Sequence, residues 1–410
     1  MTTGRVVIVG GGGAGDAAAF GLRKKGFDGE VVVISADTDR PYDRPYLSKE
    51  YLRGEVELHK VYLHQEAEYS KKQIELRLGQ RVAGGTLTGR RLTLDSGAEI
   101  AFDTLVLATG GSPRWVPGVS HAANLYTLRS LKDSQAIRDA LRESARVLFV
   151  GAGFIGAEVA ASARTMGKDV LMVEAAPVPL ARALGVEVGE VYASIHSSRG
   201  VAVSAGTTVQ EWHTSGERVI GVTLSDGRRE AIDMALLGVG INPNLELPTT
   251  LGLPIEAGGV RVDEGLRAAE GVYCAGDIAF HRHPVLGRAI RVEHWMVARG
   301  HGQGVATSIA REHSPYSTLP YFWSDQYDVS LEYRGNASGQ DQLVWRGDRE
   351  ALSFSVFYLR DSLVDAVLSL NDPKTNVVGG EMIKSRRPVD VAALSDPAVD
   401  LGQLVSVPAS

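Results

Sequence analysis

The apolar positions of the chain repeat one pattern, starting at residue 5 and again at residue 146. Residues 5–10 (RVVIVG) form an apolar run that leads into a glycine-rich turn, a helical segment over 14–26 and a second apolar run over 30–35. Residues 146–151 (RVLFVG) begin the same succession, with a helical segment over 152–167 and a strand over 169–174. Each stretch of about 30 residues predicts a βαβ unit. The copies lie too far apart for a solenoid repeat, so they predict two domains of one type.

Three more apolar runs lie outside the two βαβ units. They are FDTLVLATGG (102–111), DMALLGVGINPN (233–244) and GVYCAGD (271–277). Each predicts a buried strand that ends in a turn of small residues. In an open parallel sheet, ligands bind at the carboxyl ends of the strands. We therefore expect these turns to border the ligand sites.

The pattern changes near residue 320. PYFWSDQYDVSLEY (320–333) is aromatic and then alternates between apolar and polar positions. SFSVFYLRDSLVDAVLSL (353–370) predicts a strand, an Arg-Asp turn and a second strand. These features indicate an antiparallel sheet in a third, C-terminal α+β domain. We expect the tail after Pro388 to be loosely held.

Length, composition and charge agree with this plan. The 410 residues suffice for two or three domains, and 44% hydrophobic with 22% charged residues is typical of a soluble globular protein. A net charge of −6 and the lack of a long Lys/Arg stripe argue against a nucleic-acid binder. No apolar stretch reaches the roughly 18 residues of a membrane span. The glycines and Asp16 argue against a signal peptide at the N-terminal run.

The single cysteine, Cys274, narrows the possible chemistry. It has no partner for an intramolecular disulfide, a CxxC redox pair or a thiolate metal cluster. We therefore expect no metal site of that kind, and this cysteine usage favours a reducing, cytoplasmic location.

The first glycine-rich turn has a dinucleotide fingerprint. Gly10, Gly12 and Gly15 occupy the GxGxxG positions. The first allows a tight turn, the second lets the backbone approach a pyrophosphate, and the third lets helix and strand pack closely. An acidic residue that binds the ribose should follow the second strand. Asp37 is the nearest candidate, although it comes slightly late in the sequence.

The second turn repeats the fingerprint and predicts the coenzyme. Gly151, Gly153 and Gly156 occupy its glycine positions, and Glu174 ends the following strand at the expected spacing. A carboxylate there accepts hydrogen bonds from a free 2′-hydroxyl and repels a 2′-phosphate. No arginine follows until Arg182. The site is therefore predicted to take NAD and not NADP.

Two cradles in one chain indicate two nucleotides whose reactive rings meet. A flavin and a nicotinamide form the pair whose chemistry needs this contact, because hydride passes from the nicotinamide C4 to the flavin N5. Stacking at about 3 to 3.5 Å lowers the barrier for that transfer. We therefore expect FAD and NADH as cofactors.

Seven short motifs occur in order along the whole chain, and together they resemble one family. They are RPYLSK (44–49), LATGG (107–111), GAGFIGAE (151–158), GVGINPN (238–244), YCAGD (273–277), VEHW (292–295) and YFWSDQYD (321–328). The set resembles the NADH-dependent ferredoxin reductases that supply bacterial oxygenases and cytochromes P450. This group includes putidaredoxin and rubredoxin reductases and is similar to apoptosis-inducing factor. One departure is Tyr46, where the family often has proline.

The resemblance implies an α/β, glutathione-reductase-like fold with two Rossmann-type dinucleotide-binding domains and a C-terminal α+β domain. It implies an FAD-binding domain split between 1–112 and 243–319, an NAD-binding domain at 113–242 and a C-terminal domain at 320–410. It also implies an FAD-dependent NADH:ferredoxin oxidoreductase. The acceptor would be a small 2Fe-2S ferredoxin, with rubredoxin as the alternative.

The resemblance further implies contacts for both cofactors. For FAD these are the first fingerprint and Asp37, together with Arg44, Lys49, Val82, Thr109, Gly110, Arg129, Asp277 and Trp295. For NADH they are Gly151, Gly153, Phe154, Ile155, Gly156, Glu158, Glu174, Arg182 and Gly240.

Four residues are implied to form the catalytic centre. Lys49 and Glu158 would meet near the flavin N5, where the lysine favours the negative charge of the reduced flavin. Trp295 and Trp323 would border the flavin ring, and core packing is their alternative role. We assign His294 no catalytic role, because hydride transfer to a flavin needs no general base.

Two other functions stay open. A related flavoprotein could pass electrons to a quinone or to oxygen. Disulfide, coenzyme A-disulfide and peroxide reductases need a redox cysteine beside the flavin, whereas Cys274 lies in the strand before Asp277. A redox-sensing interaction protein, in the manner of apoptosis-inducing factor, is the second alternative. Fast ferredoxin-dependent turnover distinguishes the enzyme from the sensor.

The docking site for the acceptor is predicted from charge. Ferredoxins are commonly acidic, so cations near the flavin edge are expected to bind them. Lys384, Arg386 and Arg387 are the candidates in the C-terminal domain. A short basic run is more often a solvated turn.

Overall fold

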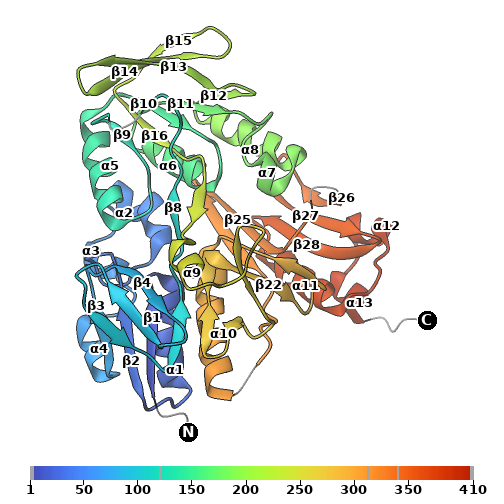
Figure 1. Ribbon diagram of the computed structural model, residues 1–410. Helices are drawn as coiled ribbons and strands as arrows, with labels where there is room; N and C mark the ends of the chain where they lie inside the picture. The colour runs from blue at the N-terminus through green and yellow to red at the C-terminus, as the bar shows by residue number, and fades with distance from the viewer. Residues whose placement is uncertain (1–3, 120–121, 312–313, 339–340, 407–410) are drawn as a thin grey trace.

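The computed structural model describes residues 4–119, 122–311, 314–338 and 341–406 (Figure 1). Its first domain is built on a six-stranded sheet in the order β20-β21-β7-β1-β2-β3. Five of these strands are parallel, and β20 is antiparallel at the edge. The bounds are β1 Arg5–Val9, β2 Glu30–Ile34, β3 Ile74–Arg77, β7 Thr104–Leu107, β20 Arg267–Ala269 and β21 Val272–Cys274. Two segments far apart in sequence thus complete one sheet.

The predicted βαβ unit forms the centre of this sheet. β1 leads into α1 (Gly13–Lys24), and α1 packs along α10 (Trp295–Arg311). The strands are continuous apolar runs because helices and loops cover both faces. Smaller elements complete the domain: η1 Arg44–Ser48, α2 Glu50–Arg53, α3 Leu58–Val61, α4 Glu66–Lys71, β4 Val82–Thr86, β5 Arg91–Leu94, β6 Glu99–Ala101, α9 Glu246–Thr250, β18 Ile255–Glu256, β19 Gly259–Val262, η2 Gly276–Ile278, β22 Ala279–His283 and β23 Arg288–Ile290.

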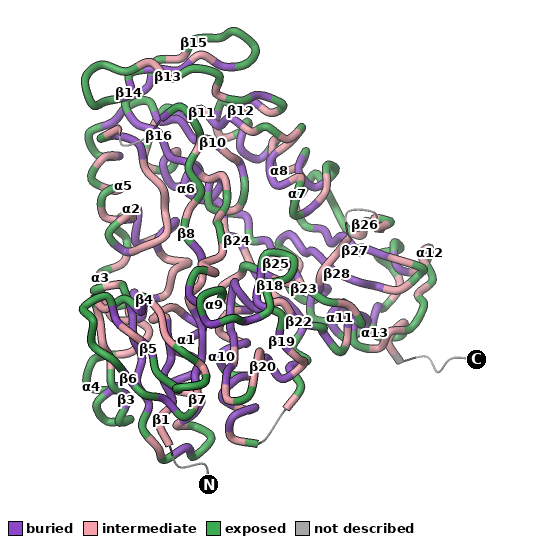
Figure 2. Tube along the Cα trace, viewed as in Figure 1, coloured by how far each residue is buried: buried purple, intermediate pink, exposed green. Residues whose placement is uncertain are grey.

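A second, five-stranded parallel sheet contains the repeated unit in the order β12-β11-β10-β16-β9. The bounds are β9 Leu125–Tyr126, α5 Leu131–Glu143, β10 Arg146–Val150, α6 Phe154–Thr165, β11 Asp169–Glu174, α7 Ala181–Leu184, α8 Val186–Ser198, β12 Ala202–Ala205 and β16 Met234–Leu237. An antiparallel sheet of β13 Val209–Ser215, β14 Arg218–Leu224 and β15 Arg229–Ala231 lies at its outer end, and Figure 2 shows much of it exposed. The strands β8 (Gly111–Pro113) and β17 (Ile241–Pro243) pair where the chain enters and leaves this region.

The C-terminal region forms an antiparallel sheet in the order β24-β25-β28-β27-β26. The bounds are β24 Tyr321–Gln326, β25 Val329–Gly335, β26 Gln342–Asp348, β27 Ser353–Arg360, β28 Leu363–Leu370, α11 Pro373–Ser385, α12 Val391–Ser395 and α13 Leu401–Ser406. The predicted fold class is therefore confirmed, including the change to antiparallel pairing near residue 320.

The prediction of a loose tail after Pro388 is wrong for the described residues. Leu394 and Leu401 are buried in one apolar cluster with Met382 and Phe357. Arg346 donates hydrogen bonds to backbone carbonyls between residues 394 and 399. Local sequence did not reveal this, because the guanidinium that holds the tail comes from a strand about 50 residues earlier.

The second and third regions share a core. Side chains from α7 and α8 pack into one face of the C-terminal sheet, where Leu184 and Tyr192 join Phe354 and Leu368. Because these apolar side chains are buried together, the shared core holds the two regions against each other. Within the described ranges, no helix has both the length and the apolar character needed to cross a bilayer.

Candidate active site

One cavity of about 1880 Å³ joins the two glycine-rich turns. Every predicted site residue lines it except Gly15 and Gly156, which lie behind the turns. A Cβ on Gly15 would come within 1.9 Å of the Gly10 carbonyl oxygen, and one on Gly156 within 2.1 Å of the Gly151 oxygen. These two glycines thus let each helix pack closely against its strand.

The first turn leaves its backbone open to the cavity. Gly10 has φ +123°, and a Cβ there would lie 2.1 Å from the Ala108 carbonyl oxygen. Gly12 is the N-cap residue of α1, and the nearest atom to a Cβ there is a guanidinium nitrogen of Arg44 at 3.6 Å. The ring of Trp295 lies over Gly13, where a Cβ would be only 2.6 Å from the ring.

Charged side chains surround this turn. Arg129 Nη2 donates to Asp277 Oδ2 at 2.6 Å, and Arg129 Nε is buried without a hydrogen-bond partner in the described structure. Burial, and secondly the nearby Arg129 guanidinium, lower the pKa of Arg44. Two guanidiniums and a helix N-terminus facing one cavity fit an anionic group such as a pyrophosphate. The residues present therefore fit a dinucleotide at this cradle.

Asp37 lies at the edge of the same cavity, three residues beyond the end of β2. Its Oδ2 accepts a hydrogen bond from the Tyr42 hydroxyl at 2.8 Å, and its Oδ1 accepts one from the Asp39 backbone N–H at 3.1 Å. The carboxylate is thus held in place, and it retains acceptor capacity for a ribose hydroxyl.

The other predicted FAD contacts lie on neighbouring loops of the cavity. Thr109 and Asn244 are tied by two hydrogen bonds, at 2.8 and 2.9 Å, each from a side chain to a backbone carbonyl. Gly110 has φ +63° and lies beside Arg129. Val82 begins β4 and lines the cavity. The two segments that frame the second βαβ region are therefore joined directly at the site.

The second turn resembles the first in backbone conformation, but its side-chain contacts differ. Gly151 has φ +94°, and Gly153 is the N-cap residue of α6. Glu174 Oε2 accepts from the Ala152 N–H at 2.6 Å, and Oε1 accepts from the Ala176 N–H at 2.7 Å. Both carboxylate oxygens are fixed at the rim of the cavity.

The remaining predicted NAD contacts also line the cavity. Gly240 has φ +95°, and a Cβ added to it would meet no described atom within 4 Å beyond its own chain neighbours, so open space lies beside its backbone. Arg182 lies on α7, and Ile155, in the first turn of α6, has 44% of its surface exposed. This half of the cavity is therefore more open than the half at the first turn.

A buried ion pair lies between the two cradles. Lys49 Nζ is 3.5 Å from Glu158 Oε1, and both residues are 5% exposed. The Ser48 hydroxyl donates to Glu158 Oε2 at 2.5 Å, and the Ser324 hydroxyl donates to Oε1 at 2.7 Å. The cation and the two donors compensate a carboxylate that would otherwise be costly to bury.

Ser48 and Ser324 are not among the predicted site residues, yet both are partners of Glu158. Ser48 directly precedes Lys49, and Ser324 directly follows Trp323. Both therefore lie inside motifs that carried the family resemblance. Their position beside the named residues was the available signal.

Aromatic rings enclose the cavity on the side of the ion pair. The Trp323 ring centroid lies 5.9 Å from Lys49 Nζ. Phe154 packs edge-on against Phe322 with ring centroids 4.9 Å apart. His294 stacks on Phe322 at 3.9 Å, and burial lowers the pKa of His294 to about 4. His294 is thus a neutral packing group near pH 7.

Cys274 does not line the cavity. It is fully buried in β21, within the apolar core of the first sheet, and burial raises the pKa of its thiol. A thiol that stays protonated and enclosed cannot serve as a redox nucleophile.

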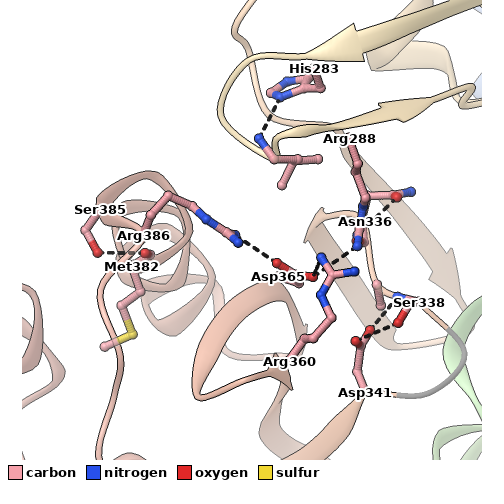
Figure 3. Close-up of polar contacts among 12 residues, drawn as sticks. His283, Arg288, Asn336, Ser338, Asp341, Arg360, Asp365, Met382, Ser385 and Arg386 are labelled. Carbon is pink, nitrogen blue, oxygen red and sulfur yellow. Dashed lines mark hydrogen bonds and ion pairs between the residues drawn. The ribbon is translucent and has the colours of Figure 1, made fainter.

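The predicted basic docking run is already engaged in contacts. Lys384 Nζ lies 2.8 Å from Glu381 Oε1. Figure 3 shows Arg386 turned toward Asp365, with its Nη1 2.8 Å from Oδ1, and the same fully buried carboxylate also pairs with Arg288 and Arg360. Arg386 therefore has a structural partner, which the sequence did not indicate.

A cavity that joins two dinucleotide cradles across a buried Lys–Glu pair defines a two-nucleotide oxidoreductase. The comparisons with known proteins lead to the same class. The model of the pyridine nucleotide-disulphide oxidoreductase family matches residues 4–302, and the reductase C-terminal model matches residues 321–405. The chain belongs to the pyridine nucleotide-disulphide oxidoreductase family, so the predicted family relationship and enzyme class are confirmed.

Named relatives share the full length of the chain. The ferredoxin–NAD(+) reductase component of the p-cumate 2,3-dioxygenase system of Pseudomonas putida is 35% identical, over 97% of both chains. Putidaredoxin reductase of Pseudomonas putida is 33% identical, over 98% of this chain and 96% of the relative. The reductase in a covalent putidaredoxin reductase–putidaredoxin complex superposes with a TM-score of 0.95 at 32% identity, over 99% of both chains.

Proposed function

We propose that the protein is an FAD-dependent NADH:ferredoxin oxidoreductase. It passes electrons from NADH via FAD to a small 2Fe-2S ferredoxin that serves an oxygenase or a cytochrome P450. The observation that carries this proposal is the single cavity lined by both fingerprints, with the Lys49–Glu158 pair between them. The roles named for the relatives support the choice of acceptor.

Each cradle has a distinct task in this proposal. Gly12 and the Arg44 and Arg129 guanidiniums hold FAD, and Asp277 orients Arg129. Gly153 and Glu174 hold NADH. Bound FAD would supply an acceptor for hydride from the nicotinamide and a donor of single electrons.

The residues between the cradles tune that exchange. The Lys49 ammonium is buried beside a cavity that Trp323 and Trp295 line, and the low dielectric of a buried position strengthens its field. Glu158 holds the ammonium in place. Phe154, at the first position of α6, packs against Phe322 and lines the cavity, where it would flank a bound nicotinamide.

The proposal includes the division of the chain into an FAD-binding domain at 1–112 and 243–319, an NAD-binding domain at 113–242 and a C-terminal domain at 320–410. It is supported by β20 and β21 joining the first sheet, and by the β8–β17 pair at the two crossing points. It also places the protein in the cytoplasm, in keeping with one buried, unpaired cysteine.

Turnover with a defined acceptor tests the proposal. Purified holoenzyme is mixed anaerobically with NADH, a 2Fe-2S ferredoxin encoded near its gene and cytochrome c, and cytochrome reduction is followed. We expect a rate that rises with ferredoxin and saturates. In parallel reactions without ferredoxin, equal NADH oxidation by a quinone under anaerobic conditions or by oxygen in air would instead assign a quinone reductase or oxidase. A long-lived reduced complex without turnover would assign a sensor.

A further inference from the structure

A chain of buried polar side chains runs from the active-site carboxylate into the shared core of α8 and the C-terminal sheet. Gln326 Nε2 donates to Ser324 Oγ at 3.2 Å, and His196 Nε2 lies 2.8 Å from Gln326 Oε1. The Tyr327 hydroxyl lies 3.1 Å from His196 Nδ1. Ser324, Gln326 and His196 are each no more than 1% exposed.

These polar residues occupy positions where apolar residues would be the simpler choice. Phe322, Ser324 and Gln326 follow one another at every second position of β24, so their side chains lie on the same face of the strand. Phe322 belongs to an apolar cluster with Leu331 and Phe354. Burial of an amide, a hydroxyl and an imidazole destabilises the fold unless each is hydrogen-bonded. The chain satisfies each of them, and it ends on Glu158.

With the Gln326 amide oxygen facing His196, every hydrogen bond in the chain has one direction. Burial lowers the pKa of His196 to about 4, so the ring is neutral near pH 7 and carries one N–H. The Gln326 carbonyl oxygen can only accept, so that proton lies on His196 Nε2, and Nδ1 accepts from the Tyr327 hydroxyl. The Gln326 amide then points its N–H toward Ser324.

This orientation decides where the one hydroxyl proton of Ser324 goes. Because Ser324 Oγ already accepts from Gln326, its own proton is free to be donated to Glu158 Oε1. If the amide were reversed, its oxygen would compete for that proton. We infer that Ser324, Gln326 and His196 are positioning residues that keep Glu158 turned toward Lys49 and so set the redox potential of the flavin. The inference rests on the proposed function, because it needs FAD in the cavity that Lys49 and Glu158 line.

The chain also explains how the C-terminal domain contributes to the site. Glu158 comes from α6, Lys49 and Ser48 from the segment of η1 and α2, and Ser324 from β24. Three regions therefore meet at one carboxylate. A donor to Glu158 disperses its negative charge, which otherwise opposes the negative charge of the reduced flavin. Loss of that donor should make the flavin harder to reduce.

A double-mutant cycle on the midpoint potential tests this inference. Ser324→Ala, Gln326→Leu and His196→Leu are made in the wild type and in a Glu158→Gln background, and the potential is measured by anaerobic equilibration with redox dyes. In the wild type we expect the ratio of reduced to oxidised flavin to fall about tenfold at a fixed ambient potential, a shift of about −30 mV for two electrons. In the Glu158→Gln background the shift should disappear.

Matched variants separate positioning from stability. Ser369→Ala removes another buried hydroxyl of the C-terminal sheet, one on β28 without a hydrogen-bond partner in the described structure, and should leave the potential unchanged. Ser324→Thr keeps the hydroxyl, so its midpoint potential should stay close to that of the wild type. Urea unfolding checks that Ser324→Ala retains the fold. An equal shift in both backgrounds, or no shift in the wild-type background, overturns the inference.

The design also keeps the two proposals apart, because neither NADH nor ferredoxin enters the measurement. Coupling to Glu158 without ferredoxin turnover would support the positioning role and contradict the proposed acceptor. Ferredoxin turnover without coupling would overturn the positioning role alone. A wild-type protein that binds no FAD would overturn both.

Discussion

The two glycine-rich cradles share a backbone and differ in what the rest of the chain adds to them. In the first, a tryptophan ring occupies the space over Gly13. The corresponding fingerprint position of the second is Phe154, whose own ring packs on Phe322. The ring beside the first cradle therefore comes from a residue distant in sequence, Trp295, while the ring at the second comes from the fingerprint itself. One βαβ unit can thus be adapted to two ligands without change to its strands.

The two cradles also differ in the charged groups that face the cavity. The first cradle has two guanidiniums and an aspartate within the cavity. The second has a carboxylate held by backbone N–H groups, and an exposed Ile155 at its entrance. Multiple charge-assisted contacts suit a cofactor that stays bound, and the more open site suits a coenzyme that must exchange at every turnover.

The largest effect should come from the charged group of the first cradle. Asp277→Ala removes the partner of Arg129 at 2.6 Å, and loss of one member of such a pair typically costs about 2–5 kcal/mol. At about 1.4 kcal/mol per tenfold, FAD should bind roughly two powers of ten more weakly. The ratio of flavin to protein absorbance after dilution and gel filtration measures this loss.

The control for Asp277→Ala is a surface pair of the same type. Asp226→Ala breaks a contact with Arg228 on the outer antiparallel sheet, where both side chains are substantially exposed. It should leave the flavin bound. Full FAD occupancy in Asp277→Ala after dilution would show that the first cradle does not depend on its charges.

The second cradle should respond in coenzyme choice and not in flavin content. Glu174 can accept hydrogen bonds from both ribose hydroxyls, a charge-assisted contact of about 1.5–3 kcal/mol, and Ala175 and Ala176 offer no cation for a 2′-phosphate. We expect NADH to be preferred by about two powers of ten in kcat/KM. Glu174→Arg should weaken NADH and improve NADPH, as measured by steady-state kinetics with both coenzymes.

The structure adds a control to this test. Glu174 also accepts hydrogen bonds from two backbone N–H groups, so Glu174→Arg removes these two hydrogen bonds as well as the negative charge. Glu174→Gln retains one acceptor and should show an intermediate preference. Flavin content and ferricyanide reduction by pre-reduced enzyme should be normal in both variants. Equal use of NADPH by the wild type would refute the assignment.

The fold could be predicted from the sequence because its signals are local. Apolar runs, glycine turns and helical segments follow one another within about 30 residues in both cradles. The prediction failed where contacts are long-range. Ser324 reaches Glu158 across 166 positions, and Arg386 shares Asp365 with arginines from two other strands. Neither partner can be identified from spacing, because only the packed sheets bring them together.

A moderate effect is expected where the two cradles meet. Lys49→Ala and Glu158→Ala each break a buried pair that lies beside the cavity. Loss of a charged hydrogen bond of about 1.5–3 kcal/mol should slow flavin reduction by NADH about tenfold to a hundredfold. Stopped-flow absorbance measures this rate, and urea unfolding checks that the fold is retained. Wild-type reduction rates in both variants would remove the pair from the mechanism.

The smallest effect should lie outside both cradles, at the docking surface for the acceptor. Arg386 is a poor probe, because its reversal would strand the buried Asp365 that it shares with Arg288 and Arg360. Lys384→Glu is the better probe, since its contact with Glu381 is exposed and exposed pairs contribute only about 0.2–1 kcal/mol. The ferredoxin KM should rise by roughly twofold to fivefold at low salt, and its dependence on ionic strength should weaken.

Lys132→Glu, on α5, offers a comparable charge change in the region of the second cradle and should leave the ferredoxin KM unchanged. Because docking is separate from both nucleotide sites, FAD content and the KM for NADH should be unaffected in each variant. A salt dependence identical to that of the wild type would place the docking surface away from Lys384.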